Sequence, residues 1–428
     1  MSKKFSRRLF LETGAATWAA LACGVSSGQS NPSNQPVGKS VVFQEDHVDV
    51  LVVGGGTAGI MAALQAARAG VKTMLVERSS QLGGTITNGG LSSPGMFNAW
   101  GKQIIAGIGW DLVKRTIETD GGNLPDFSEP YKNNHGHFQP PINPFVFTLL
   151  AEDDCIKAGV EIRYYEFPLG VEPTENGWRV AVVGAGVRRT ILCRQLIDCT
   201  GGGDVVALAG FHRLREEETQ PGAILYKFGS AFNPGRERLP GLGTYVPGAD
   251  SSNSITRTRD NILGRQTVLQ KLRSEKSKNS ASARLFLLQP ESAVRESWRI
   301  DSEYVITGDD YTTGRKFDDA ICYAFFPVDI HRVQKKATLE NLKEGIIPTV
   351  PLRALVPKGG KNILAAGRCV GSDRIANSGL RVQAPCMAMG QAAGAAAALA
   401  AKKNGHPLTV PFKELRQLLE EHGAIVPD

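Results

Sequence analysis

Residues 48–78 read VDVLVVGGGTAGIMAALQAARAGVKTMLVER. Their first six residues form a short apolar run, and the glycine-rich segment Gly54-Gly-Gly56-Thr-Ala-Gly59 follows at once. Next comes an alanine-rich stretch that ends at Gly70, and then a second apolar run that ends at Glu77. β-branched apolar runs favour buried strands, and alanine favours helix. The stretch therefore predicts a strand, a tight turn, a helix and a second, parallel strand.

The glycines have the spacing G-x-G-x-x-G, and Glu77 follows Gly54 by 23 positions (77 − 54), near the ~20 typical of dinucleotide-binding turns. In such turns the first glycine permits the bend, the second lets the backbone approach a pyrophosphate, and Gly59 would let helix pack on strand. The helix N-terminus attracts phosphate, and Glu77 can accept hydrogen bonds from a ribose diol. This context predicts a dinucleotide site.

Three further segments place glycine or polar residues directly after a predicted strand. They are Leu82-Gly-Gly-Thr85, Ile197-Asp-Cys-Thr-Gly-Gly-Gly-Asp204 and Asn362 to Arg368. The third is followed by Leu380-Arg-Val-Gln-Ala-Pro385 and an alanine-rich helix that runs to Ala401, and proline suits the first turn of a helix.

Together these segments resemble the FAD-dependent oxidoreductase family with a glutathione-reductase-type, Rossmann-like FAD domain. The resemblance runs from about residue 47 to 402 and includes cap-domain-like segments at 294–299 and 327–331 and a segment at 351–357. It implies FAD, with the last helix pointing its N-terminus at the flavin. The residues it assigns to FAD are Gly54, Gly56, Thr57, Ala58, Gly59, Glu77, Arg78, Gly83, Gly84, Thr85, Thr200, Gly201, Asp204, Gly367, Arg368, Arg381 and Gln383.

Two departures from the family pattern stand out. Gly367-Arg368 replaces the Gly-Asp that many relatives use to hold the ribitol. The following segment, expected to be a loop at 372–377, lacks the histidine that the family often has there. No catalytic role is carried over to it.

The segment Val182-Val-Gly-Ala-Gly186-Val187 looks like a second dinucleotide turn, but position 189, where the third glycine would stand, is arginine. The residues after it read as an extended strand, so a hairpin turn is expected here. We therefore expect no NAD(P) domain.

The predicted fold class is α/β: a discontinuous Rossmann-like FAD-binding domain with a β-meander, plus an α+β substrate or cap domain. The predicted layout follows. Residues 1–22 form a signal peptide, 23–43 a flexible linker, 44–100, 141–212 and 351–402 the FAD domain, 101–140 a lid or loop region, 213–350 the cap domain and 403–428 a C-terminal segment.

Hydride transfer at flavin N5 needs a base near the substrate, and histidine suits that role. His331 stands two residues after Asp329, so on a strand the carboxylate shares its face and can orient the ring. The predicted catalytic residues are His331, Asp329 and Arg381, with a structural role for the histidine as the alternative. Arg381 or Arg353 would bind an anionic substrate or the flavin O2 edge. Further candidates are His135, His137 and His212, and Cys369 and Cys386 are expected near the flavin.

The seven cysteines contain no C-x-x-C pair, so neither a metal site nor a redox disulfide is predicted. The net charge of +7 includes +3 from the first 22 residues, and the remaining +4 gives little support for a nucleic-acid partner. No apolar run reaches the roughly 18–20 residues of a membrane span, and the longest, 387–401, is expected to be a buried helix.

Arg7-Arg8 precede a mildly apolar run, and Ala20-Leu-Ala22 forms an A-x-A cleavage pattern before Cys23. This order matches a twin-arginine (Tat) export signal, so the Tat machinery is an expected partner and the periplasm or another extracytoplasmic space the expected location. A lipid anchor on Cys23 is the alternative to cleavage.

The sequence thus predicts an exported FAD-dependent oxidoreductase that exchanges a hydride between an unidentified small molecule and flavin N5. Oxygen, a quinone or a redox protein would be the electron acceptor. The alternatives are a NAD-dependent dehydrogenase and a non-catalytic, flavin-binding electron carrier.

Overall fold

The computed structural model describes residues 41–127, 135–229, 242–246, 250–277, 284–332 and 338–428. The predicted signal peptide and nearly all of the predicted linker lie outside these residues. Val42–Asp428 form one unit, to which the following description applies.

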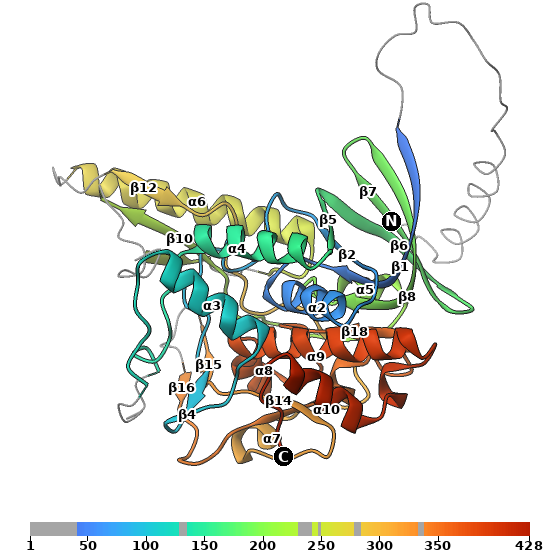
Figure 1. Cartoon of the computed structure of the whole chain (residues 1–428). Coiled ribbons are helices and arrows are strands. Elements are labelled where there is room, and N and C mark those ends of the chain that lie inside the picture. The colour runs from blue at the N-terminus through green and yellow to red at the C-terminus, as the bar shows by residue number, and fades with distance from the viewer. Residues whose placement is uncertain (1–40, 128–134, 230–241, 247–249, 278–283, 333–337) are drawn as a thin grey trace, which may run out of the picture. The chain divides into compact units, whose positions relative to one another are not determined.

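A parallel sheet forms the centre of the fold (Figure 1). Its strands, in spatial order, are β5 (Glu161–Tyr164), β2 (Thr73–Glu77), β1 (Val42–Val53), β8 (Val187–Asp198) and β18 (Ile363–Ala365). The strand ends Val53, Glu77 and Asp198 thereby come to one edge of the sheet, where doubly wound folds bind their ligands. The predicted strand at 48–53 begins six residues earlier, at Val42, because the polar stretch before it pairs with β8. Since that stretch is mostly exposed, no apolar pattern announces it.

A β-meander continues the sheet on the other side of β8. β6 (Glu166–Thr174) pairs with β7 (Gly177–Gly184), and β7 pairs antiparallel with the first half of β8. The turn between β7 and β8 contains Gly186, whose φ of 75° lies in the left-handed region that glycine adopts readily. The hairpin predicted at 182–187, in place of a second nucleotide turn, is confirmed.

Helix α9 (Gln383–Lys402) packs against α2 (Thr57–Arg68), as Figure 1 shows. The two backbones lie so close that a Cβ at Gly390 would stand 2.1 Å from the carbonyl oxygen of Ala58. Helix α9 is long and apolar enough to cross a membrane by length and composition, but 89% of its most apolar window is buried inside the protein. The predicted buried helix is therefore confirmed.

Residues 101–140 differ from the prediction of a loop or lid. Helix α3 (Ile108–Thr119) lies within them and buries Trp110, Leu112 and Val113. It packs against α4 (Pro144–Lys157), α2 and α9. An apolar face spaced at helical period explains this helix, and the glycines around it obscured the pattern. Residues 128–134 of the predicted lid lie outside the described residues.

The cap segment is a mixed α and β region, as predicted. Helix α6 (Ser254–Ser277) runs beside a sheet of β11 (Leu242–Tyr245), β10 (Ala223–Phe228) and β12 (Leu285–Leu288) (Figure 1). The remaining cap elements are β9 (Arg213–Leu214), β13 (Arg299–Ile300), α7 (Gly308–Thr313), β14 (Ala320–Tyr323), β15 (Val328–Ile330), β16 (Thr338–Glu340) and β17 (Thr349–Pro351). Elsewhere lie β3 (Asn98–Ala99), β4 (Lys102–Gln103), α5 (Asp204–Leu208), α10 (Phe412–Glu421) and the 3-10 helices η1 (Leu352–Leu355) and η2 (Pro407–Thr409).

The loop predicted at 372–377 is wrong in its second half, which begins helix α8 (Arg374–Leu380). Asp373 caps this helix, because its side chain accepts a hydrogen bond from the Ala376 amide. Its other carboxylate oxygen accepts from the Gly308 amide, so the cap also ties α8 to α7. Helix α8 leads directly to Arg381.

Candidate functional site

The turn between β1 and α2 has the geometry that the glycine spacing predicts. Gly54 has φ 102°, and a Cβ there would meet the Cys199 carbonyl at 2.5 Å. A Cβ at Gly59 would stand 1.8 Å from the Gly54 carbonyl oxygen, so helix and turn touch backbone to backbone. A Cβ at Gly56 would meet no protein atom within 4 Å. Gly56 therefore faces open space, where a ligand can approach the backbone.

Glu77, at the end of β2, is held by two backbone amides. Its Oε2 accepts from Gly55 N at 2.6 Å and its Oε1 from Ser79 N at 2.8 Å. Each carboxylate oxygen has a second lone pair, so the fixed carboxylate can still accept from a ribose hydroxyl.

The end of β8 is organised by Asp198, a buried residue that the sequence analysis did not single out. Its Oδ1 accepts from the amide and hydroxyl of Thr200 at 2.9 and 2.7 Å, and its Oδ2 from the Val206 amide at 3.0 Å. Burial raises the pKa of Asp198 to about 6. The Thr200 hydroxyl in turn accepts from the Asp204 amide. The sequence feature that could have identified Asp198 is its position just before Cys199-Thr-Gly201. Asp198 shapes the loop that follows β8.

One cavity, about 360 Å³ in volume, runs along these loops and continues under the cap segment. Every residue that the sequence analysis assigned to the cofactor lines it except Gly59 and Gly83. Both exceptions are packing positions, since a Cβ at Gly83 would meet Thr87 Cγ2 at 2.5 Å.

Three arginines line the middle of this cavity: Arg78, Arg257 and Arg368. Arg78 and Arg257 share the carboxylate of Glu291, with N–O distances of 3.3 and 2.7 Å. Arg368 donates to the carbonyl oxygens of Gly201 and Val294. Burial lowers the pKa of Arg257 to about 10, and the charge of Arg78 adds to the effect. Guanidinium groups therefore line this part of the cavity, and guanidinium groups bind the oxygens of a pyrophosphate.

Arg257 was not predicted as a site residue. It comes from α6 in the cap segment, far in sequence from the glycine turn. Arg368, where relatives have aspartate, joins the end of β8 to the cap segment through its two carbonyl contacts.

At the far end of the cavity lie Asp329, on β15, and His331, the residue that directly follows this strand. His331 Nε2 lies 2.8 Å from Asp329 Oδ2, and Nδ1 lies 2.7 Å from the hydroxyl of Tyr245. Burial lowers the pKa of His331, and the bond to Asp329 offsets this only in part. The neutral ring carries its proton on Nε2, because a carboxylate can only accept, so Tyr245 donates to Nδ1. Tyr245, like Asp198 and Arg257, is a residue that the sequence analysis missed.

Asp329 is ionised. Burial acts against its charge, but the hydrogen bond from His331 and the charges of Arg381 and Arg295 outweigh it and hold the pKa of Asp329 below its ordinary value. Arg381 Nη2 donates to the Asp329 carbonyl at 3.0 Å and to Gln220 Oε1 at 3.2 Å. The structure thus brings together all three predicted catalytic residues.

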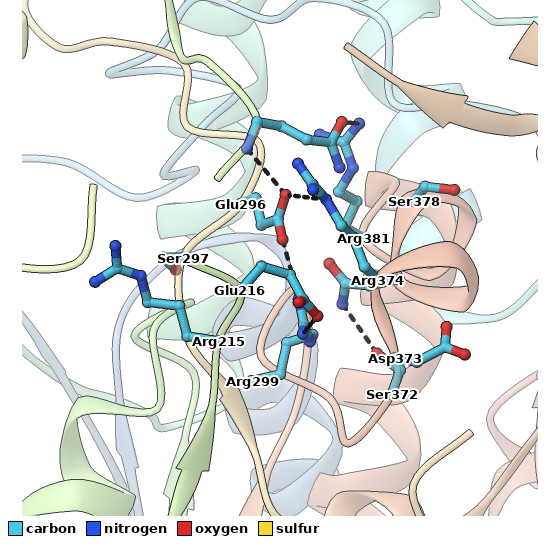
Figure 2. Close-up of polar contacts among 12 residues, drawn as sticks. Arg215, Glu216, Glu296, Ser297, Arg299, Ser372, Asp373, Arg374, Ser378 and Arg381 are labelled. Atoms are coloured by element: carbon cyan, nitrogen blue, oxygen red, sulfur yellow. Dashed lines mark hydrogen bonds and ion pairs between the residues drawn. The ribbon is translucent and has the colours of Figure 1, made fainter. Parts of the chain in front are cut away.

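A buried ion network lies behind this group (Figure 2). Glu296, 1% exposed, accepts from Arg374 Nε and Arg299 Nη1, each at 3.1 Å. It also accepts from the Gln220 amide at 2.9 Å. The side chain of Gln220 meets both Arg381 and the His331 amide. Glu296 therefore positions the far end of the cavity through Gln220.

The other predicted candidates lie elsewhere. Arg353 packs over Tyr304 and Phe317 and pairs with Asp319 at 3.5 Å, outside the cavity lining. His212 is exposed, and His135 stacks edge-on against Phe326, which does line the cavity. Cys386 lines the cavity, and Cys369 is buried. All six cysteines among the described residues are buried and unpaired, and Cys23 lies outside those residues.

The fold and the cavity define a dinucleotide-binding protein with a Rossmann-like fold. The sequence pattern of the family called FAD dependent oxidoreductase matches residues 49–223 and 215–419. The chain belongs to this family, and FAD is its cofactor. Family membership decides against the NAD-dependent alternative.

The similarity to curated relatives is partial. The chain is 36% identical to glutathione reductase of Yarrowia lipolytica over 146 residues, covering 31% of this chain and 29% of that protein. It is 28% identical to aklavinone 12-hydroxylase DnrF of Streptomyces peucetius over 174 residues, covering 36% and 35%. The chain thus spans about a third of these relatives. A solved geranylgeranyl bacteriochlorophyll reductase-like protein from Thermoplasma acidophilum is 13% identical, with coverage of 88% and 84% and a TM-score of 0.45.

The residues present fit FAD. Both side-chain polar atoms of Gln383, at the start of α9, are buried and have no hydrogen-bond partner among the described residues. An amide offers one donor and one acceptor, which is what the pyrimidine edge of a flavin needs. The positive end of the α9 dipole lies at the same place. The glycine turn, Glu77 and the three arginines would hold the ribose and pyrophosphate.

Proposed function

We propose that this chain is an exported oxidoreductase that transfers a hydride between a small molecule and N5 of its FAD. One observation carries the proposal: the cavity lined by the dinucleotide turn also reaches His331, Asp329 and Arg381. Cofactor and candidate acid–base residues would therefore share one cavity.

FAD bound in this cavity supplies a hydride acceptor or donor at its N5 atom. The chain's own part is to move the proton that accompanies the hydride. Because Nδ1 of neutral His331 already accepts from the Tyr245 hydroxyl, a proton would reach it by relay: Tyr245 gives its proton to Nδ1 as it takes one from its other side. The ionised Asp329 stabilises the resulting imidazolium and fixes the ring. Tyr245, partly exposed and bonded to Nδ1, links it to solvent.

The electrons would leave through oxygen, a quinone or a redox protein. The hairpin at 182–187 supports this, because it removes the candidate for a second nucleotide turn. The enclosed polar group at the far end favours an enzyme over a carrier without a substrate.

Anaerobic mixing of the purified protein with panels of alcohols, amines and acids tests the proposal. We expect one class to bleach the visible flavin absorption, and air or a quinone to restore it. His331→Gln should keep its colour but bleach far more slowly. A protein that binds FAD yet is reduced by no panel member, while dithionite reduces it fully, would instead be a carrier. Acid precipitation of the same sample shows whether the FAD is covalently held.

We also propose export through the Tat pathway, supported by Arg7-Arg8, the apolar run after them and the A-x-A pattern. Fusing residues 1–45 to a reporter that is active only outside the cytoplasm tests this. Replacing both arginines with lysine should abolish reporter activity. Unchanged activity in that variant would refute the Tat route, and Cys23→Ala separates cleavage from lipid anchoring.

A further inference from the structure

The far end of the cavity holds more positive than negative charge. Arg295 and Arg381 both line it, and among the described residues Asp329 is the carboxylate that comes within 4 Å of either, at 3.8 Å from Arg381 Nη2. Asp329 already accepts from His331 at 2.8 Å, and that ring is neutral. The charge of Glu296 also acts on Arg381, but that carboxylate is already shared by Arg299 and Arg374. Among the groups that line this end of the cavity, two guanidinium charges therefore face one carboxylate.

Among the described residues, Arg381 keeps an unsatisfied donor, and neither arginine has a carboxylate within hydrogen-bond distance. The side chain of Arg381 is only 9% exposed, and its Nε is buried without a partner. Its Nη2 donates hydrogen bonds to two neutral oxygens, the backbone carbonyl of Asp329 and Oε1 of Gln220. Arg295 donates to the Pro221 carbonyl and lies 5.0 Å from the centre of the Tyr245 ring. Buried guanidinium groups are ordinarily paired with anions.

The charge of Arg295 also acts on the pKa of Arg381. Burial lowers the pKa of Arg381 to about 10, and the charge of Arg295 adds to the effect. Burial likewise lowers the pKa of Arg295. Two guanidinium groups in one cavity repel each other. An anion bound beside both would offset this repulsion, so the pair favours anion binding.

We propose that Arg295 and Arg381 together bind a single carboxylate group of the substrate. A monocarboxylate fits because two guanidinium charges face one carboxylate here, and a planar carboxylate matches the fork of a guanidinium. This inference rests on the proposed function, since it assigns the charge of the substrate at the same site. His331, bonded to the Asp329 that lies beside Arg381, would then stand next to the anchored acid.

The test uses the FAD-loaded protein and four probes: acetate, benzoate, and their uncharged counterparts acetamide and benzamide. Binding is followed by the change in the visible absorption of the oxidised flavin. We expect saturable changes with a carboxylate and none with the matching amide. Arg295→Gln should weaken carboxylate binding by about tenfold to a hundredfold, the range for losing a hydrogen bond to a charged group.

Two further variants make the result specific. Arg295→Lys keeps the charge but not the fork, and should give an intermediate affinity. Arg353→Gln removes an arginine outside the cavity and should bind benzoate as the unchanged protein does. FAD content and the melting temperature of each variant show that it is folded.

The inference is overturned if benzamide binds as well as benzoate, or if Arg295→Gln leaves benzoate affinity unchanged while shifting the reduction potential of the flavin. In the latter case the arginines serve the flavin. Carboxylate binding without reduction by any acid would support the ligand class and count against hydride transfer, so the two failures are distinguishable.

Discussion

The two ends of the cavity are built in different ways. The nucleotide end is centred on one short stretch, in which the glycine turn follows β1 and Glu77 ends the neighbouring β2. Arg257 and Arg368 join it from other segments. The far end is made of side chains from five separate segments, those of Gln220, Tyr245, Arg295, His331 and Arg381.

This difference decides what each end can tolerate. A site made of backbone depends on the absence of side chains. Adding one methyl group there should therefore weaken FAD binding without moving the rest of the site. A composite of side chains depends on the cap segment being held in place, so damage to a distant support such as Glu296 reaches it. Substitutions at one end should therefore leave the other intact.

The largest effect is expected for His331→Gln. Removing the base should slow reduction by the substrate by about 10²–10⁴-fold, the usual contribution of general acid–base catalysis. Because His331 lies at the far end, FAD content should not change. Stopped-flow absorbance under anaerobic conditions measures the rate, with His212→Gln, an exposed histidine, as the control.

The pH profile sharpens this prediction. Burial lowers the pKa of His331 below its ordinary 6.5. If His331 takes a proton from the substrate, the rate should rise with pH through a value below 6.5, because the protonated ring cannot accept. His331→Gln should lack this limb, and a variant that keeps it would show that another group is the base.

The second largest effect should come from Glu296→Gln. The substitution removes the buried charge that Arg299 and Arg374 share, and breaking a buried ion pair costs about 3–5 kcal/mol. Arg299 retains Glu216, so we expect the lower end of that range. Denaturant unfolding measures the loss.

Glu216→Gln is the matched control, because Glu216 pairs with the same arginine but is 46% exposed. Its loss should cost about 1 kcal/mol or less. Equal losses in the two variants would mean that Glu296 has no special supporting role. Weaker benzoate binding in Glu296→Gln alone would confirm the path through Gln220.

The two ends also differ in how much of each could be predicted from the sequence. The glycine turn, Glu77, the meander and α9 are local patterns, and each was predictable from residues close together in the chain. Arg257 lines the cavity although it lies on α6, and nothing near it in the sequence indicates this. Tyr245 contacts His331 from β11, and this pairing depends on the folded cap segment. Arg295 falls in the cap-domain-like segment 294–299, but that segment does not indicate that its side chain lines the cavity. His331 and Asp329 were predictable as a pair because two-residue spacing on a strand is itself local. The helix at α3 was missed because glycines on either side masked its apolar face.

A smaller effect is expected for Gly56→Ala, at the nucleotide end. The new methyl group would meet no protein atom within 4 Å, so the apoprotein should melt as before. It would occupy the space of the pyrophosphate, and FAD affinity should fall by about tenfold, or 1.4 kcal/mol. Calorimetric titration of apoprotein with FAD measures this. Gly170→Ala in β6, also without neighbours within 4 Å, is the control. A lower melting temperature in Gly56→Ala would mean that the turn itself is strained.

The smallest effect should appear at Asp260, on α6, the helix that carries Arg257 to the nucleotide end. Asp260 is 3% exposed, its Oδ2 has no protein partner, and burial raises its pKa to about 6. A raised pKa means that the fold prefers the protonated acid. Protonated Asp260 therefore adds to the stability of the fold. This added stability is complete below pH 3.8, the ordinary pKa of aspartate, and is lost as the pH rises through about 6.

Asp260→Asn removes the titration while keeping the shape of the side chain. At pH 4 the variant should have the same melting temperature as the unchanged protein. At pH 8 its melting temperature should be higher, by on the order of 1 °C for a chain of this size. Melting curves at both values, with Asp309→Asn on α7 as an exposed control, measure the difference. Helix α6 belongs to the cap segment and carries Arg257 into the cavity. Tighter FAD binding by Asp260→Asn at pH 8 would therefore show that the cap segment and the nucleotide end are coupled through this helix. A gain in stability without any change in FAD affinity would show that they are separable.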